Sequence, residues 1–181
     1  VESDIDENGV KLGTTDLIRR RWLDNNFYVL NASANYQSSK LNMTFSSSYS
    51  TYSGDHFGEV VWARQFGENS SIRDRYYEGN GKKRDFSVFA KASYFLNKKL
   101  EFYGDLQLRN VGYKTKGFTS GLVNMIIDES YSFFNPKFGL SYKFNTNSIL
   151  YGSYSRANRE PSRSDYESDP NIKREQLNDF E

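Results

Sequence analysis

The chain has 181 residues, and 24 Lys and Arg against 23 Asp and Glu give a formal net charge of +1. This length suits one domain or part of a larger one. An aromatic content of 17% argues against intrinsic disorder, and the balanced charge gives no reason to expect a nucleic-acid partner. The absence of cysteine excludes a disulfide scaffold, a thiolate metal site and a cysteine nucleophile.

From the two ends of the sequence we expect a piece of a longer chain. It begins with Val1, its first eight residues are acidic and polar rather than typical of a signal peptide, and residues 176–181 stop inside a predicted element. No apolar run approaches the ~18 residues of a transmembrane helix, so a helical membrane protein is not expected.

Three short polar segments predict tight turns between pairs of strands. They are residues 37–40, 96–99 and 145–148, and each combines Asn, Ser or Lys between two alternating runs. Such segments are typical of β-hairpins. The six strands are expected near residues 28–36, 41–49, 86–94, 100–108, 138–144 and 149–154.

Five of these six strands alternate between apolar and polar residues with a period of two. In the fourth, Leu106 and Leu108 face one way and Gln107 faces the other. This period indicates strands with one apolar face. In the sixth strand two sets compete for the apolar face: Ile149 with Tyr151, and Leu150 with Tyr154.

The connections between the hairpins are predicted to be long loops. Residues 54–82 and about 111–135 each span roughly 25 residues, and residues 158–175 form a similar, charged segment. Loops of this length are uncommon in compact domains. Short turns that alternate with long loops are typical of an outer-membrane β-barrel, whose strands cross the bilayer with about 9–11 residues.

A soluble β-sandwich would also contain alternating strands, but three features favour the membrane barrel. The polar face is rich in Asn, Ser, Thr and Gln, as a wet lumen requires, and the apolar face includes small residues that fill a sandwich core poorly. Tyr36, Tyr94 and Phe144 precede the three turns, as in an interfacial aromatic girdle. We therefore expect an all-β, antiparallel up-and-down meander of about six long strands that forms an arc of a wider barrel.

Three segments resemble TonB-dependent outer-membrane receptors of the Bacteroides type. They are residues 15–28 (TDLIRRRWLDNNFY), residues 150–166 (LYGSYSRANREPSRSDY) and residues 172–181 (IKREQLNDFE). The last resembles the family's "LKPE…DYE" element, which opens the next strand, with Arg174 in place of the usual proline. The strand rhythm between these segments extends the resemblance over nearly the whole chain.

The resemblance implies a 22-stranded transmembrane barrel with an N-terminal plug domain, located in the outer membrane of a Gram-negative cell. Residues 1–181 would be part of the barrel domain, without the plug. Such receptors import a scarce nutrient, most often a ferric siderophore or other iron complex, and the TonB complex drives import through the plug. A glycan or cobalamin importer of the same family, or a non-transporting adhesin or structural barrel, is the alternative.

Two groups of residues are candidate ligand contacts. Arg19, Arg20 and Arg21 suit phosphates of lipopolysaccharide or an anionic ligand at the rim, although a solvated rim beside Asp16 and Asp24 is the simpler interpretation. The second group lies in the first predicted long loop and is suited to contact a ferric ligand. It consists of Asp74, Tyr76, Tyr77 and Glu78.

Other signals are weaker. His56 is the single histidine and, without cysteine, is interpreted as an ordinary loop residue rather than a metal ligand or a catalytic base. We therefore expect no enzyme, no catalytic residue, no cofactor and no metal site. Charges on the lumen face are expected mainly to pair with one another, and these are Glu101, Asp105, Arg109, Lys137 and Lys143.

An excised arc of a barrel would leave two strand edges unpaired and its lipid face exposed. We expect the isolated chain to self-associate or to require detergent.

Overall fold

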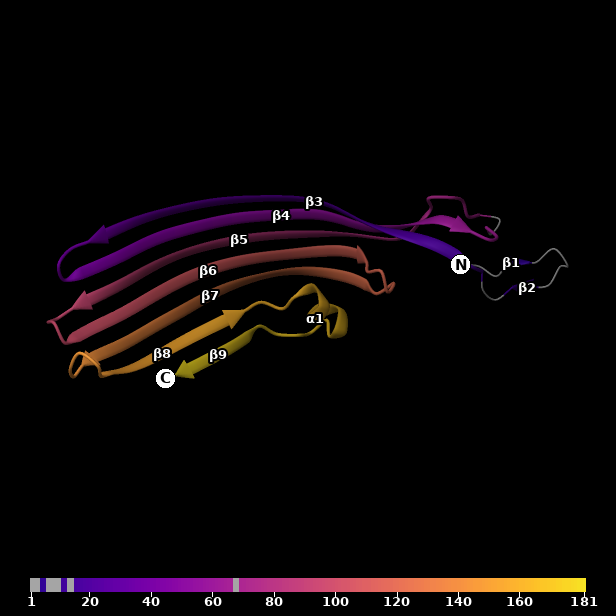
Figure 1. Ribbon diagram of the computed structural model, residues 1–181. Helices are drawn as coiled ribbons and strands as arrows, with labels where there is room; N and C mark the ends of the chain where they lie inside the picture. The colour runs from indigo at the N-terminus through magenta and orange to yellow at the C-terminus, as the bar shows by residue number, and fades with distance from the viewer. Residues whose placement is uncertain (1–3, 6–10, 13–14, 67–68) are drawn as a thin grey trace. The chain divides into compact units, whose positions relative to one another are not determined.

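The computed structural model describes residues 4–5, 11–12, 15–66 and 69–181. Seven strands form one antiparallel sheet in chain order, so each lies beside the next in sequence (Figure 1). This confirms the all-β meander and adds one strand at its C-terminal end. The elements are β1 Asp4–Ile5 and β2 Lys11–Leu12, which pair separately, then β3 Leu17–Gln37, β4 Leu41–Ala63, β5 Arg75–Phe95, β6 Leu100–Phe118, β7 Asn124–Lys143, β8 Ile149–Arg159, α1 Arg163–Ser168 and β9 Glu175–Phe180.

The chain folds as two compact units. Strands β3 to β7 contribute residues to both, whereas β8, α1 and β9 belong to the second alone. The first unit comprises residues 1–26, 52–82 and 114–127, and the second comprises residues 27–51, 83–113 and 128–181.

The first unit contains strands where the sequence predicted long loops. β4 continues to Ala63, β5 begins at Arg75, β6 continues to Phe118 and β7 begins at Asn124. The prediction of two loops of roughly 25 residues is therefore wrong. β4 to β7 are 19–23 residues long, about twice the length expected for a single bilayer crossing.

Two glycines in β4 resemble turn residues in sequence but occupy packing positions in the strand. A Cβ at Gly54 would collide with the Tyr52 side chain, and a Cβ at Gly58 would collide with the rings of Tyr76 and Tyr77. A glycine inside a strand often marks such a close approach. Polar residues also occur at both odd and even positions of residues 52–59, so the period-two signal of a strand is absent there.

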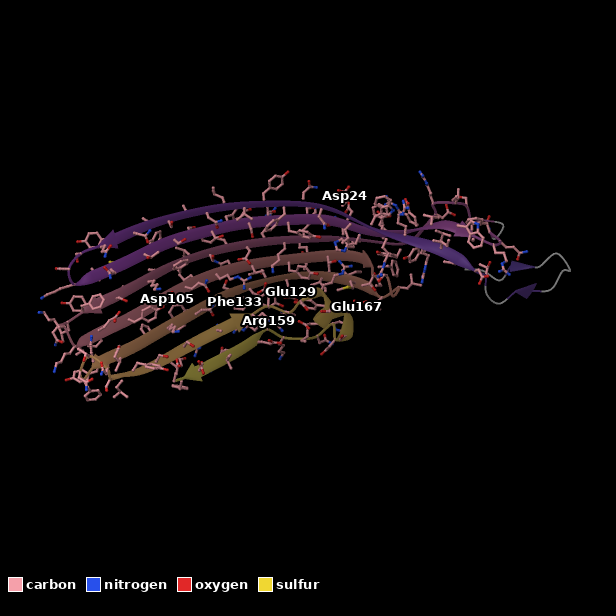
Figure 2. The ribbon with its side chains drawn as sticks, viewed as in Figure 1. Asp24, Asp105, Glu129, Phe133, Arg159 and Glu167 are labelled. Atoms are coloured by element: carbon pink, nitrogen blue, oxygen red, sulfur yellow. The ribbon has the colours of Figure 1, made fainter. Side chains whose placement is uncertain are left out.

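In the second unit the apolar face of the sheet is the exposed one. Side chains project from both faces (Figure 2), and Leu30, Leu108 and Phe138 remain 71%, 54% and 50% exposed. By contrast, Val111 in β6 and Phe133 in β7 are buried. The period-two alternation of their strands places both residues on the polar face. A soluble sheet buries its apolar face, so this arrangement indicates a face that meets lipid.

All three predicted hairpin turns are confirmed, and they lie at one end of the second unit (Figure 1). The Ser38 hydroxyl oxygen accepts from the Leu41 backbone N–H at 3.1 Å. The Asn97 side-chain oxygen accepts from the backbone N–H groups of Lys99 and Leu100 at 2.8 and 3.0 Å. These side chains satisfy the backbone groups that a tight turn leaves unpaired.

The register between β7 and β8 identifies the apolar face of the sixth predicted strand. Tyr142 lies opposite Leu150, and Phe138 lies opposite Tyr154. Opposite residues of an antiparallel pair point to the same side of the sheet. Leu150 and Tyr154 therefore share the lipid-facing side, whereas Tyr151 lies on the other.

The segment between β8 and β9, residues 160–174, folds onto the polar face of the second unit, and we call it the strap. It contains α1, whose N-terminus has a capping box between Ser162 and Asp165. Tyr166 is 4% exposed, stacks on Tyr113 at 5.9 Å and shares a hydrogen bond with the Tyr131 hydroxyl. In the part of the chain that the structure describes, no helix is long and apolar enough to cross a membrane.

Candidate functional site

The three predicted rim arginines lie in β3, in the first unit, and they divide between the two faces of the strand. Consecutive residues of a strand point to opposite faces, so Arg20 faces away from Arg19 and Arg21. Arg19 lies over the ring of Tyr76 at 5.0 Å, and Arg21 approaches the Ser120 hydroxyl at 3.5 Å. Asp16 pairs instead with Arg64, so the arginines are not simply neutralised by their sequence neighbours.

The contact between Arg19 and Tyr76 brings together the two groups of residues that the sequence singled out. Tyr76, Tyr77 and Glu78 lie in β5 rather than in a loop, which corrects their expected placement. Tyr77 is 7% exposed and packs edge-on against Tyr76, with ring centres 5.0 Å apart. Glu78 pairs with Arg75 at 3.2 Å.

Asp74, by contrast, lies in the connection before β5 as predicted. Its carboxylate accepts from the Ser71 backbone N–H at 2.6 Å and from the Ser71 hydroxyl at 2.8 Å. These hydrogen bonds, the backbone one foremost, lower the pKa of Asp74 below its ordinary value. The carboxylate is therefore held ionised and closes the turn.

A second arrangement on the first unit was not found from the sequence. Trp22 stacks on Phe57 with ring centres 6.3 Å apart and planes at 17°. Arg20 lies over Trp22 at 5.5 Å, and Arg75 lies over Phe57 at 3.8 Å. The Trp22 indole N–H donates to Glu59 at 3.2 Å. We call these five residues the arginine–aromatic ladder; they come from three strands, and only the tertiary pairing assembles them.

A cavity of about 530 Å³ adjoins the ladder. Its lining is completed by Val61 of β4 and by Ile72 and Arg73 of the connection between β4 and β5. Arg73 has a φ of 71°, a conformation that side-chain-bearing residues rarely adopt, and its N–H donates to the Val60 carbonyl at 2.8 Å. The cavity therefore presents guanidinium groups beside two aromatic rings.

His56 lies in β4, so its expected loop position is wrong. Its Nε2 lies 2.8 Å from the Tyr52 hydroxyl, which in turn donates to the Asn25 side chain. Among the described residues, no group of three or more His, Asp or Glu side chains is placed to bind a metal ion.

In the second unit, four charged side chains form a network that anchors the strap. Glu160 accepts from Lys83 at 2.6 Å and from Arg109 at 2.8 Å, and Arg109 also donates to Asp85. The Glu160 side chain is only 8% exposed. Burial opposes ionisation of Glu160, but the hydrogen bonds from Lys83, from its own backbone and from Arg109 outweigh it and lower the pKa of Glu160.

The lumen-face charges pair differently from the expectation of mutual pairing. Arg109 pairs with Asp85 and Glu160 rather than with Glu101 or Asp105. Asp105 accepts from the Tyr103 hydroxyl at 3.4 Å. The strap, which had no predicted role, supplies the carboxylate that the arginine binds.

A family model described as TonB dependent receptor-like, beta-barrel, matches residues 3–181. The comparison with curated proteins gave no match. A sequential antiparallel meander with a lipid-suited face and a polar opposite face is what such a barrel requires. The chain therefore belongs to the TonB-dependent receptors, the nutrient receptors and transporters of the Gram-negative outer membrane, and forms part of their β-barrel.

Proposed function

We propose that this receptor, of the Bacteroides type, actively imports a ferric siderophore or another iron complex. The observation that supports this most directly is the contact of Arg19 with Tyr76 at 5.0 Å. Ferric siderophores are commonly anionic and many carry aromatic rings. A guanidinium over a tyrosine ring offers charge and a stacking surface to one such ligand.

In this proposal the first unit makes the ligand contacts. Arg19 and Arg21 attract the anion, while the half-buried Tyr76 provides the ring, and Arg20 faces away from this group. The buried Tyr77 holds Tyr76 in place. The two carboxylates, Asp74 and Glu78, complete the group.

The rest of the receptor completes the transport mechanism. Residues 1–181 form part of a 22-stranded barrel, and a plug domain elsewhere in the protein closes the lumen and contacts TonB. The ligand binds at the first unit, and the polar face of the sheet lines its path once the plug moves. The alternative functions are import of a glycan or of cobalamin by the same mechanism, and adhesion without any transport.

The test is uptake of a labelled ferric siderophore by cells that carry or lack the gene for the full-length receptor, each with TonB intact or deleted. Uptake that requires both genes is the expected result. Equal uptake in all four strains, repeated with several iron complexes, would contradict iron transport. Uptake of labelled cobalamin or of a labelled glycan would then be tested in the same strains. Uptake of one of them would identify the cargo, and uptake of neither would favour the adhesin.

A pair of tyrosine variants tests the ligand contacts. Tyr76→Leu removes the ring beneath Arg19 and should raise the half-saturating ligand concentration by about tenfold, which corresponds to about 1.4 kcal/mol of binding free energy. The matched control is Tyr49→Leu, an exposed ring on the apolar face of the second unit. Unchanged uptake in the Tyr76 variant, at equal surface abundance, would remove this residue from the site.

A further inference from the structure

We infer that the cavity beside the arginine–aromatic ladder is a binding site for a phosphate group carried on a sugar ring. The inference does not depend on iron transport. It rests on the composition of the cavity, on the way its arginines are held, and on the balance of charge around it.

The composition of the cavity matches the two parts of such a ligand. Arg20 and Arg73 line it, and guanidinium groups bind phosphate oxygens through paired N–H donors. Trp22 and Phe57 line the same cavity with nearly parallel rings. The negative faces of aromatic rings attract the weakly positive C–H groups on one side of a sugar ring.

The third lining group is a carboxylate, and its position favours a sugar over a bare anion. Glu59 already accepts from the Trp22 indole N–H at 3.2 Å, which fixes the ring and leaves carboxylate lone pairs for further donors. A sugar offers several hydroxyl donors, whereas inorganic phosphate at neutral pH keeps only one or two and carries the negative charge itself. Glu59 therefore repels a free phosphate and offsets little of that repulsion with hydrogen bonds, whereas it can accept from several sugar hydroxyls.

The Arg20 guanidinium and the Arg73 backbone are held in place before any ligand binds. Arg20 lies over Trp22 at 5.5 Å. Arg73 sits in the left-handed region, and two hydrogen bonds between its segment and β4 hold it there: Arg73 N–H to the Val60 carbonyl at 2.8 Å and Val60 N–H to the Asp74 carbonyl at 3.1 Å. Strained residues that are held in this way concentrate at functional sites.

The volume of the cavity and the net charge of its lining also suit a phosphorylated sugar. About 530 Å³ is within the range of small-molecule sites and accommodates one or two sugar rings. The charged residues that line the cavity are two arginines, Arg20 and Arg73, and one carboxylate, Glu59, so the lining carries a net positive charge. Two sources offer this chemistry: the phosphorylated glucosamine headgroup of an outer-leaflet lipid, and a soluble sugar phosphate.

The test is calorimetric titration of the purified full-length receptor in detergent. The probes are glucosamine 1-phosphate, its two halves glucosamine and inorganic phosphate, and lipid A in mixed micelles. We expect the ester or the lipid to bind at least about tenfold more tightly than either half. Binding of the lipid alone would identify a headgroup site, and binding of the soluble ester alone or of both would identify a site open to solvent.

Four variants locate the binding. Arg20→Gln and Arg73→Asn remove charge, and asparagine tolerates the left-handed backbone at position 73, so folding is preserved. Each should weaken binding of the ester or lipid about tenfold. Trp22→Leu should weaken binding of the probes that carry a sugar and leave the binding of inorganic phosphate unchanged. Arg64→Gln is the control, because Arg64 is exposed, lies outside the cavity and pairs with Asp16.

Three results would overturn the inference. One is failure of both the ester and the lipid to bind the native receptor. Another is inorganic phosphate or glucosamine binding as tightly as the whole ester. The third is an equal loss of affinity in Arg64→Gln and in the cavity variants. Iron uptake is measured separately in cells, so loss of the proposed transport function would leave this result unaffected.

Discussion

Gly117 in β6 lies so close to β5 that the side chain of any other residue would collide with the neighbouring backbone. Its φ is 112°, and a Cβ there would collide with the Glu78 carbonyl oxygen and the Gly79 backbone. Both the backbone conformation and the close approach therefore require glycine.

Gly117→Ala should destabilise the full-length receptor by about 1–3 kcal/mol, the usual cost of a strained backbone. Thermal unfolding in detergent measures the effect. Gly112→Ala in the same strand is the matched control, because a Cβ at Gly112 meets nothing within 4 Å. Equal unfolding temperatures for the two variants would show that the packing around Gly117 can relax.

Glu160 is the buried carboxylate of the strap network, and its replacement should loosen the strap. Glu160→Gln leaves Lys83 and Arg109 without their shared anion and should cost about 1–3 kcal/mol of local stability. Hydrogen exchange of residues 160–174 in the full-length receptor measures it. The control is Glu167→Gln, an exposed carboxylate of α1 (Figure 2). Unchanged exchange in the Glu160 variant would contradict the anchoring role.

At the scale of the element, the strap depends on one aromatic side chain. Burial, followed by the hydrogen bond with Tyr131, raises the pKa of Tyr166 and keeps its hydroxyl neutral. Tyr166→Ala should release the strap at a cost of about 3 kcal/mol, because it removes a buried ring. Tyr166→Phe should cost only about 1 kcal/mol, the value of the hydrogen bond. The rate of limited proteolysis between β8 and β9 measures the effect, and Tyr166→Ala should be cleaved faster than Tyr166→Phe. Faster cleavage of Tyr166→Phe would show that the hydrogen bond contributes more than the buried ring.

The strap should also loosen in acid. The pKa values of Glu160 and Asp165 are lowered from ordinary values of 4.5 and 3.8, for Asp165 through the Ser162 backbone N–H first and its hydroxyl second. A carboxylate with a lowered folded-state pKa stabilises the fold above its ordinary value, and that contribution is lost as the pH falls through the folded-state pKa. Protection of residues 160–174 should therefore be constant above about pH 6 and decline below about pH 4.5.

Hydrogen exchange at a series of pH values, corrected for the intrinsic exchange rate, checks this prediction. Glu160→Gln removes one of the two groups, so its protection should depend less on pH than that of the native receptor. Protection of the strap that increases as the pH falls would contradict the prediction. It would mean that groups with raised pKa values control the stability of the strap.

At the scale of the whole molecule, the exposed apolar face and the sheet edges determine how the excised chain behaves. Among the described residues, β3 and β9 stand at the two ends of the sheet order, and Phe180 in β9 is 77% exposed. Open edges and a continuous apolar face favour association in water. Residues 1–181 in plain buffer should therefore form aggregates by light scattering, and detergent should reduce their size. A monodisperse monomer without detergent would contradict the lipid-facing assignment.

Much of the second unit could be predicted from the sequence because its strands have one apolar and one polar face. Alternation such as Leu106, Gln107 and Leu108 is a local property of the chain, and the three Asn- and Ser-containing turns are closed by their own side chains. The first unit lacks this signal. Gly54 and Gly58 lie in a segment that was predicted to be a loop, although a Cβ at either position would meet a tyrosine side chain that packs there.

The fold class, the hairpin turns and the resemblance to TonB-dependent receptors could therefore be predicted from the sequence, because they depend on residues close together in the chain. The packing of the strands against one another sets which face Leu150 occupies, where the strap lies and which side chains form the arginine–aromatic ladder. Those features join residues from different strands, such as Trp22 with Phe57 and Arg109 with Glu160. Strand register sets such pairings, and a shift of one residue would send each side chain to the opposite face.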